Sequence, residues 1–161
     1  MSRHRLRVGL ISDTHGVLRP EAVEVLRGSD FIIPAGDIGN MAILDQLAAI
    51  APVSAVRGNN DNGTWAAKLP ETEVLNVGDI SIYILHDLGQ LALDPEAAHF
   101  QVVVSGHSHQ PRIEERNGVL YVNPGSAGPR RFTLPVSAGE LVVSGSSVLP
   151  QLFTLRAGSA A

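Results

Sequence analysis

The amino-acid sequence predicts an α/β (α+β) fold in which two β-sheets pack face to face and helices cover their outer sides. The first third of the chain alternates between strand-like and helix-like segments, whereas the rest contains pairs of strand-like segments joined by short turns. The chain has 161 residues, of which 44% are hydrophobic. This size and composition suit a single domain over residues 1–161 with a substantial core.

In the alternating part, runs of branched apolar residues predict buried strands, and the helices between them have recognisable ends. The first helix begins with Pro20, has Glu21 in its first turn and is followed by Gly28. The expected strands are residues 8–11, 31–34 and 53–56, and the expected helices are residues 20–27 and 41–50. This order predicts parallel strands packed between helices.

The later part predicts antiparallel pairs. Asn117-Gly118 is the strongest short hairpin signal in the chain, and Pro150 predicts an edge position for the last strand because proline has no N–H to donate. The expected hairpins pair residues 71–76 with 80–85, 112–116 with 119–122, and 137–143 with 147–154; a buried strand is expected at 102–104 and a short helix at 95–99.

Composition excludes several classes of protein. The chain has no cysteine, which excludes disulfides and thiolate metal sites. A net charge of -4 and an aromatic content of 4% do not favour nucleic acid as a partner. No apolar run approaches the roughly 20 residues of a membrane span, and no segment resembles a secretory signal. We therefore expect a cytoplasmic protein with no membrane partner.

Five short segments contain residues that commonly bind metals, and most of them directly follow a predicted strand. The candidate ligands are Asp13 and His15 in Ser-Asp-Thr-His-Gly, Asp37 in Ala-Gly-Asp, Asn59 in Gly-Asn-Asn-Asp, His86 in Leu-His-Asp, and His107 and His109 in Gly-His-Ser-His. Loops at the ends of strands can be brought together by a rigid sheet. The five segments together therefore predict a metal centre.

Each segment taken alone also has a plainer interpretation. Gly-Asp and Gly-Asn-Asn-Asp are common turn sequences, and a single histidine such as His86 is more often a packing or surface residue. Gly-His-Ser-His is the most specific segment, because two histidines two positions apart after a three-valine strand are poorly placed for packing. The plainer interpretation would need five coincidences in one chain.

The order of these segments resembles the calcineurin-like metallophosphoesterase superfamily, and within it the short single-domain phosphodiesterase branch. The similarity extends to Asn123-Pro124-Gly125-Ser126 and to Arg130 shortly after it, with Ser126 expected to line the pocket. It implies a four-layer sandwich: two mixed β-sheets packed face to face, with helices on the outside.

The resemblance also implies two divalent transition-metal ions that share one carboxylate. One ion would be held by Asp13, His15, Asp37 and His109, and the other by Asp37, Asn59, His86 and His107. Nitrogen and oxygen donors without sulfur suit Mn²⁺, Fe, Co²⁺, Ni²⁺ or Zn²⁺, and we expect Mn²⁺ to be the activating ion.

The implied activity is that of a phosphodiesterase, in which a hydroxide bridging the two ions attacks phosphorus. Two ions bring four positive charges, and the carboxylates of Asp13 and Asp37 with the hydroxide remove three of them. The remaining positive charge matches the single negative charge of a phosphodiester. A phosphomonoesterase or nuclease on the same site, and a non-catalytic protein-binding scaffold of the same fold, are the alternatives.

Further residues near the ligands are candidate catalytic groups. Asn60 stands where many members of the superfamily have a histidine that protonates the leaving group, and an amide cannot do so. Asp61 either orients a histidine or caps a turn. Arg130, with Arg131 beside it, either contacts phosphate or lies in solvent. Asp87 stands where relatives often have glycine, and we assign no role to it. The expected partner is a small phosphoester, and an antiparallel sheet edge allows a homo-oligomer.

Overall fold

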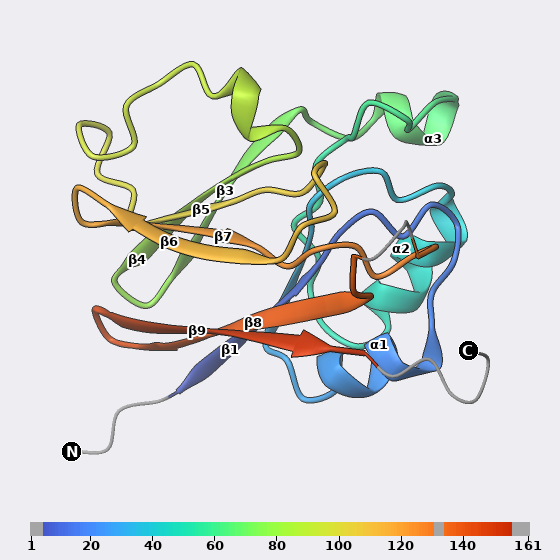
Figure 1. Ribbon diagram of the computed structural model, residues 1–161, viewed down its shortest axis with the longest axis horizontal. Helices are drawn as coiled ribbons and strands as arrows, with labels where there is room; N and C mark the ends of the chain where they lie inside the picture. The colour runs from blue at the N-terminus through green and yellow to red at the C-terminus, as the bar shows by residue number, and fades with distance from the viewer. Residues whose placement is uncertain (1–4, 131–133, 156–161) are drawn as a thin grey trace.

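The strands of the protein form two mixed β-sheets (Figure 1) in a computed structural model that describes residues 5–130 and 134–155. The strands are β1 (Leu6–Ile11), β2 (Phe31–Pro34), β3 (Thr72–Val77), β4 (Ile80–Leu85), β5 (Val102–Val104), β6 (Arg112–Arg116), β7 (Val119–Asn123), β8 (Ser137–Ser144) and β9 (Ser147–Thr154). One sheet has the order β2-β1-β8-β9 and the other the order β3-β4-β5-β7-β6. Parallel pairs lie at the centre of the second sheet, between β4, β5 and β7, and at one edge of the first, between β1 and β2.

Helices are short and cover mainly one sheet. They are α1 (Pro20–Leu26), α2 (Met41–Ala48), α3 (Thr64–Ala67) and the 3₁₀ turn η1 (Leu88–Gln90). Side chains of α1 and α2 pack with those of β1 and β2 in one apolar cluster, so these two helices cover the outer face of the four-stranded sheet. No helix in the described part of the chain is both long and apolar enough to span a membrane.

The main core lies between the two sheets. Val8 and Leu10 of β1 pack against a cluster that includes Ile82 and Ile84 of β4, and all four side chains are inaccessible to solvent. Gly9, between the two β1 residues, faces the opposite side, where a Cβ would lie 2.6 Å from a side-chain atom of Leu26 in α1. The alternation of side chains along a strand therefore gives β1 one face for each of two apolar layers.

The expected sandwich of two mixed sheets is confirmed, but its outermost layers are unequal. On the five-stranded sheet the outer face is covered by the segment 86–101, whose regular structure among the described residues is the single turn η1. Leu88 and Leu91 of this segment pack against a cluster that includes Val103 of β5 and Tyr121 of β7. A loop with few apolar anchors thus takes the place of the helical layer that the sequence predicts.

All three predicted hairpins are present. The turn residues Asn117 and Gly118 both have positive φ, 51° and 77°, as a two-residue type I′ turn requires. The strand that contains Pro150 lies at the edge of its sheet, as expected.

The third predicted strand, at residues 53–56, is wrong as a strand. Its N–H groups at Ser54 and Val56 donate to the carbonyl oxygens of Ile32 and Pro34, at 2.9 and 3.2 Å, so the segment runs beside β2. Only an isolated bridge between Ile32 and Val53 forms. Pro34 has no N–H to donate back, and the parallel ladder therefore stops there.

The predicted short helix at residues 95–99 is also wrong. The N–H of Ala98 donates to the carbonyl of Asp94, but His99 then takes a positive φ of 65°, and the N–H of Phe100 donates to Pro95. The segment is one turn whose hydrogen bonds do not repeat. Conversely, α3 and η1 are too short to give a periodic signal in the sequence.

We predict that Ile82→Ala destabilises the protein by about 2–5 kcal/mol, because Ile82 is fully buried between the sheets. Val74→Ala is the control, since Val74 lies in the adjacent strand of the same sheet but is 42% exposed; we expect it to change stability by less than about 0.5 kcal/mol. Urea denaturation measures both. Equal losses in the two variants would contradict the placement of the core between the sheets.

Candidate metal centre

The candidate ligands lie on loops that follow strands of both sheets, and backbone hydrogen bonds tie these loops together. In the first sheet, the N–H groups of Asp13 and His15 donate to the carbonyl oxygens of Gly36 and Asp37, at 3.0 and 2.9 Å. In the second sheet, the N–H of Gly106 donates to the carbonyl oxygen of His86 at 2.9 Å. Each sheet therefore presents two ligand loops as one unit.

The backbone at the candidate ligands is strained. Five of the seven have positive φ, a conformation that costs free energy for any residue other than glycine. They are Asp13 (φ 55°), His15 (φ 48°), Asp37 (φ 50°), His107 (φ 72°) and His109 (φ 62°). Elsewhere in residues 5–130 and 134–155, only His99 and Asn117 share this feature among the non-glycine residues. Such concentrated strain is typical of functional sites.

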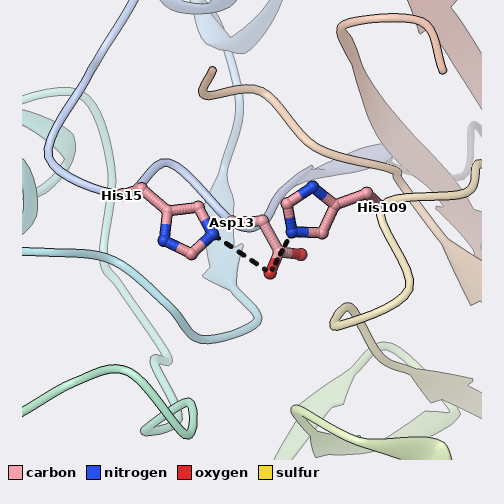
Figure 2. Close-up of side chains that lie close together, drawn as sticks. All are labelled: Asp13, His15 and His109. Atoms are coloured by element: carbon pink, nitrogen blue, oxygen red, sulfur yellow. Dashed lines mark ion pairs between the residues drawn. The ribbon is translucent and has the colours of Figure 1, made fainter. Parts of the chain in front are cut away.

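The first group of ligands consists of Asp13, His15 and His109, whose ligand atoms lie within 4.8 Å of one another. Figure 2 shows the two imidazole rings on either side of the Asp13 carboxylate. Asp13 Oδ1 lies 3.9 Å from His15 Nε2 and 3.4 Å from His109 Nε2. Asp13 is completely buried. His15 is on the same loop as Asp13, whereas His109 comes from a loop far away in the sequence.

The two oxygen atoms of Asp13 have different surroundings. Oδ2 accepts hydrogen bonds from the hydroxyl of Ser12, at 2.8 Å, and from the N–H of His107, at 3.1 Å. Oδ1 faces the histidines and accepts no hydrogen bond from residues 5–130 or 134–155. One oxygen thus fixes the carboxylate and the other remains for a ligand.

The second group consists of Asp37, His86 and His107, again with ligand atoms within 4.8 Å of one another. His86 Nε2 lies 3.2 Å from Asp37 Oδ2, while its Nδ1 lies 2.6 Å from the carbonyl oxygen of Ala35. A carbonyl can only accept, so the ring carries its proton on Nδ1 and presents the lone pair of Nε2 to the centre. Gly36 makes this approach possible, since a Cβ there would lie 2.4 Å from His86 Nδ1.

The two groups lie next to each other, with Asp13 and Asp37 at the boundary between them. Asp37 Oδ2 lies 3.9 Å from His15 Nε2 of the first group, and Asp13 Oδ1 lies 3.8 Å from His86 Nε2 of the second. Asn59 Oδ1 lies 3.2 Å from His107 Nδ1 at the exposed side of the second group. The structure therefore brings all seven candidate ligands together, with Asp37 within reach of both groups.

The electrostatics favour positive charge at the centre. Burial raises the pKa of Asp13 above its ordinary 3.8, although His86 and the Ser12 hydroxyl oppose this effect. Burial also acts to raise the pKa of Asp37, but His86 and the N–H groups of Asn60 outweigh it and bring the pKa to about 2. Burial lowers the pKa of His86, but Asp37, the Ala35 carbonyl and Asp13 together raise it above 6.5.

These observations fit a bound cation. Among the described residues, Asp13 Oδ1, His15 Nε2 and His86 Nε2 are all buried without a hydrogen-bond partner, which is costly unless another group satisfies them. These atoms converge on one place, and the raised pKa of His86 shows that its surroundings favour a positive charge there. A divalent cation would supply that charge and bind the unsatisfied atoms. The donors are nitrogen and oxygen atoms, which suit transition metals.

The three candidate catalytic residues have different surroundings. Asn60 contacts the centre directly, because its N–H and its side-chain amide donate to the two oxygens of Asp37, at 2.8 and 3.0 Å. Asp61 accepts from the N–H groups of Gly39 and Gly58, at 3.0 and 2.9 Å, which favours turn capping over the orientation of a histidine. Arg130 is exposed.

The resemblance predicts that Ser126 lines the pocket, and Arg131 is expected either to contact phosphate or to lie in solvent. Arg131 lies outside the described residues. Ser126 is buried, and its hydroxyl donates to the carbonyl oxygen of Asp13 at 3.1 Å, so it supports the ligand loop.

The residues that hold the ligand loops in place were not predicted from the sequence. The side-chain amide of Asn123 donates to the carbonyl of Gly106 and to the hydroxyl of Ser108, at 2.9 and 3.1 Å. Ser12 holds Asp13, as described above. The motif Asn123-Pro124-Gly125-Ser126 was the available signal, but it did not show which loops these side chains would reach.

A family model described as the calcineurin-like phosphoesterase superfamily domain matches residues 6–144. The chain belongs to this superfamily. It is 37% identical over 132 residues to a probable metallophosphoesterase of Methanocaldococcus jannaschii, covering 74% of this chain and 67% of that protein. It is 38% identical over 139 residues to a probable metallophosphoesterase of Methanothermobacter thermautotrophicus, covering 80% and 81%. A phosphodiesterase of M. jannaschii is 26% identical over 138 residues, covering 74% and 83%.

Solved structures share the fold of this superfamily member. Vacuolar protein sorting 29 from Cryptosporidium parvum has a TM-score of 0.82 at 23% identity, with 96% of this chain and 94% of that chain covered. Vps29 from Entamoeba histolytica, complexed with Zn²⁺, has a TM-score of 0.79 at 25% identity, with 96% and 95% covered. The E. coli phosphoesterase Yfce has a TM-score of 0.67 at 20% identity, with 94% and 100% covered.

We predict that Gly106→Ala weakens metal binding by about 10- to 100-fold, because a Cβ there would lie 2.0 Å from Ser12 Oγ and 2.8 Å from Asp13 Oδ2. The clash would break the contact that fixes Asp13. Gly118→Ala is the control: no atom of the described residues lies within 4 Å of the added Cβ, so the variant carries only the cost of its positive φ, about 1–2 kcal/mol. Equilibrium dialysis with elemental analysis measures metal affinity. Equal affinities in both variants would contradict this account of Asp13.

Proposed function

We propose that this chain is a single-domain, metal-dependent phosphodiesterase that uses two divalent ions, with Mn²⁺ as the activating ion. One observation carries the proposal: two groups of nitrogen and oxygen ligand atoms, each within 4.8 Å of one another, lie next to each other, and Asp37 is close to histidines of both groups. Such a pair of adjacent sites is what hydrolysis of a phosphoester by two metal ions requires. The phosphodiesterase of M. jannaschii, 26% identical, supports the choice of a diester.

In this proposal the seven candidate ligands hold two ions, which would supply a water of lowered pKa and positive charge to offset that of the phosphate. Asp13 and Asp37 bring the two negative charges. Ser12 and Asn60 hold those carboxylates in place by hydrogen bonds of 2.8–3.0 Å, and the Ala35 carbonyl sets the tautomer of His86. Fixed ligands of this kind need no reorganisation when substrate binds.

A phosphomonoesterase or a nuclease that uses the same site is the alternative activity. The aromatic content of 4% and the net charge of -4 argue against a nuclease, which needs surfaces that stack bases and attract phosphates. A small phosphodiester is therefore the proposed substrate.

A non-catalytic binding scaffold is the second candidate, favoured by the likeness to Vps29 structures. A scaffold has no need of unsatisfied ligand atoms in strained loops. Here Asp13 Oδ1, His15 Nε2 and His86 Nε2 are buried and form no hydrogen bond within the described part of the chain. The free-energy cost of burying these unsatisfied atoms is easier to explain for an enzyme, in which metal ions would bind them. A metal-loaded protein that is inert toward all phosphoesters would favour the scaffold.

We predict that metal-stripped protein is inactive and that Mn²⁺ restores hydrolysis of bis(p-nitrophenyl) phosphate more than of p-nitrophenyl phosphate. Two variants give a matched test, because His109 and His99 both have positive φ and asparagine tolerates that conformation. We expect His109→Asn to lose metal and activity, whereas His99→Asn, on an exposed turn, keeps both. Elemental analysis and absorbance assays measure the two properties. Full activity of stripped protein, or of His109→Asn, would refute the proposal.

We predict that hydrolysis slows steeply as the leaving group of an aryl phosphodiester becomes more basic. Asn60 cannot protonate the leaving group, and its backbone N–H and its side-chain amide both donate to Asp37. We expect Asn60→His to flatten the dependence, while Asn76→His, on the exposed side of strand β3, leaves it unchanged. A series of substituted aryl diesters measures the slope, with metal content checked for each variant. A flat dependence in the unaltered protein would show that another group acts as the acid.

A further inference from the structure

Asp87 follows the candidate ligand His86 and lies at the mouth of the second ligand group. Its Oδ1 accepts a hydrogen bond from the N–H of Gly89 at 2.9 Å, so the side chain caps η1 and is fixed by it. With Oδ1 held, Oδ2 lies 3.8 Å from His107 Nε2. The Asp87 side chain is 35% exposed, and Asp87 is not a member of either ligand group. A fixed negative charge therefore stands beside the centre without belonging to it.

Two pockets adjoin the second ligand group, and Asp87 is the residue that both share. The first is lined by residues that include Asp87, Leu88, His107, Gln110, Tyr121 and Asn123. The second is lined by residues that include Arg57, Asn59, Glu71, His86, Asp87 and Gln90. A phosphate at the second ligand group would thus adjoin both pockets, which meet at Asp87. This arrangement suits a phosphate with two substituents.

The cations of these pockets cancel the charge of Asp87 in one pocket but not in the other. Arg57 pairs with Glu71 at 3.1 Å, and Asp61 lies in the same pocket, which leaves that pocket acidic. In the other pocket, Arg112 and Arg116 both pair with Glu114. The guanidinium of Arg116 also lies over the ring of Tyr121, 4.7 Å from its centre. With Asp87 included, the first pocket has no net charge and the second is negative.

We propose that Asp87 makes the site select the single negative charge of a phosphodiester and exclude dianionic phosphomonoesters. The inference rests on the proposed function and specifies its substrate class. A monoester lacks one substituent, so it would present an additional charged oxygen to one of the pockets that Asp87 borders. Two like charges a few ångströms apart repel strongly where water is partly excluded. Specificity would then come from a repulsive group acting on the wrong substrate.

The test compares Asp87→Asn with Asp87→Glu and with Asp94→Asn. Asparagine keeps an oxygen that can cap η1 but removes the charge, whereas glutamate keeps the charge. Asp94 is the matched control, because its Oδ1 caps the next turn of the same loop through the N–H groups of Glu96 and Ala97, at 3.1 and 3.5 Å. The kcat/KM ratio of bis(p-nitrophenyl) phosphate to p-nitrophenyl phosphate is measured for each variant. Calorimetry measures the affinity of the Mn²⁺-loaded proteins for inorganic phosphate.

We expect Asp87→Asn to raise kcat/KM for the monoester about five- to tenfold, to bind inorganic phosphate tighter by a similar factor, and to leave diester hydrolysis within about twofold. Both gains should shrink as ionic strength rises from about 0.01 M to about 1 M, where the Debye length falls from about 30 to about 3 Å. Asp87→Glu and Asp94→Asn should behave like the unaltered protein.

Two results would overturn the inference. One is an unchanged phosphate affinity in Asp87→Asn. The other is a loss of metal in that variant, which would make Asp87 a ligand. If the unaltered protein hydrolyses no phosphoester, the proposed function fails, but the phosphate affinities still decide the role of Asp87.

Discussion

The buried carboxylate of Asp13 is the interaction on which the whole site depends. It is completely inaccessible to solvent, and burial of a carboxylate is costly unless donors or cations compensate for it. Two donors hold one oxygen: the hydroxyl of Ser12, at the end of the same strand, and the N–H of His107, from a loop of the other sheet. The other oxygen faces two histidines from two loops. One side chain thereby links both sheets to the centre.

The rest of the architecture follows from the need to bring loops this close. Side chains on the adjoining backbones would collide, and glycines at Gly36 and Gly106 leave room for the ring of His86 and the hydroxyl of Ser12. The close approach of the loops also strains the backbone, which is left-handed at five candidate ligands. A core packed between two sheets can maintain such strain, because the strand ends cannot relax without disturbing it. The base of the site is therefore rigid, and in the proposed function the selection of substrate falls to residues at its rim.

Much of the fold was predictable because its signals are local. The three hairpins follow from turn residues such as Asn117-Gly118, and the edge position of β9 follows from Pro150. The failures occurred where local signals are weak or misleading. Val53 and its neighbours have the composition of a strand, but their ladder stops at Pro34, a residue of another segment. The outer layer over the five-stranded sheet is a loop held by Leu88 and Leu91, and such apolar anchors have no periodic pattern.

The sequence by itself determined the kinds of ligand atoms and their order along the chain. Ligand chemistry is a property of side chains, and the ends of strands can be recognised locally. Only the tertiary structure decided that Asn60 holds Asp37, that Asp61 caps a turn, and that Asn123 supports the loop of His107. It also placed Asp87 where two pockets meet. These roles depend on contacts between segments far apart in the chain, and such contacts exist only once the two sheets have packed together.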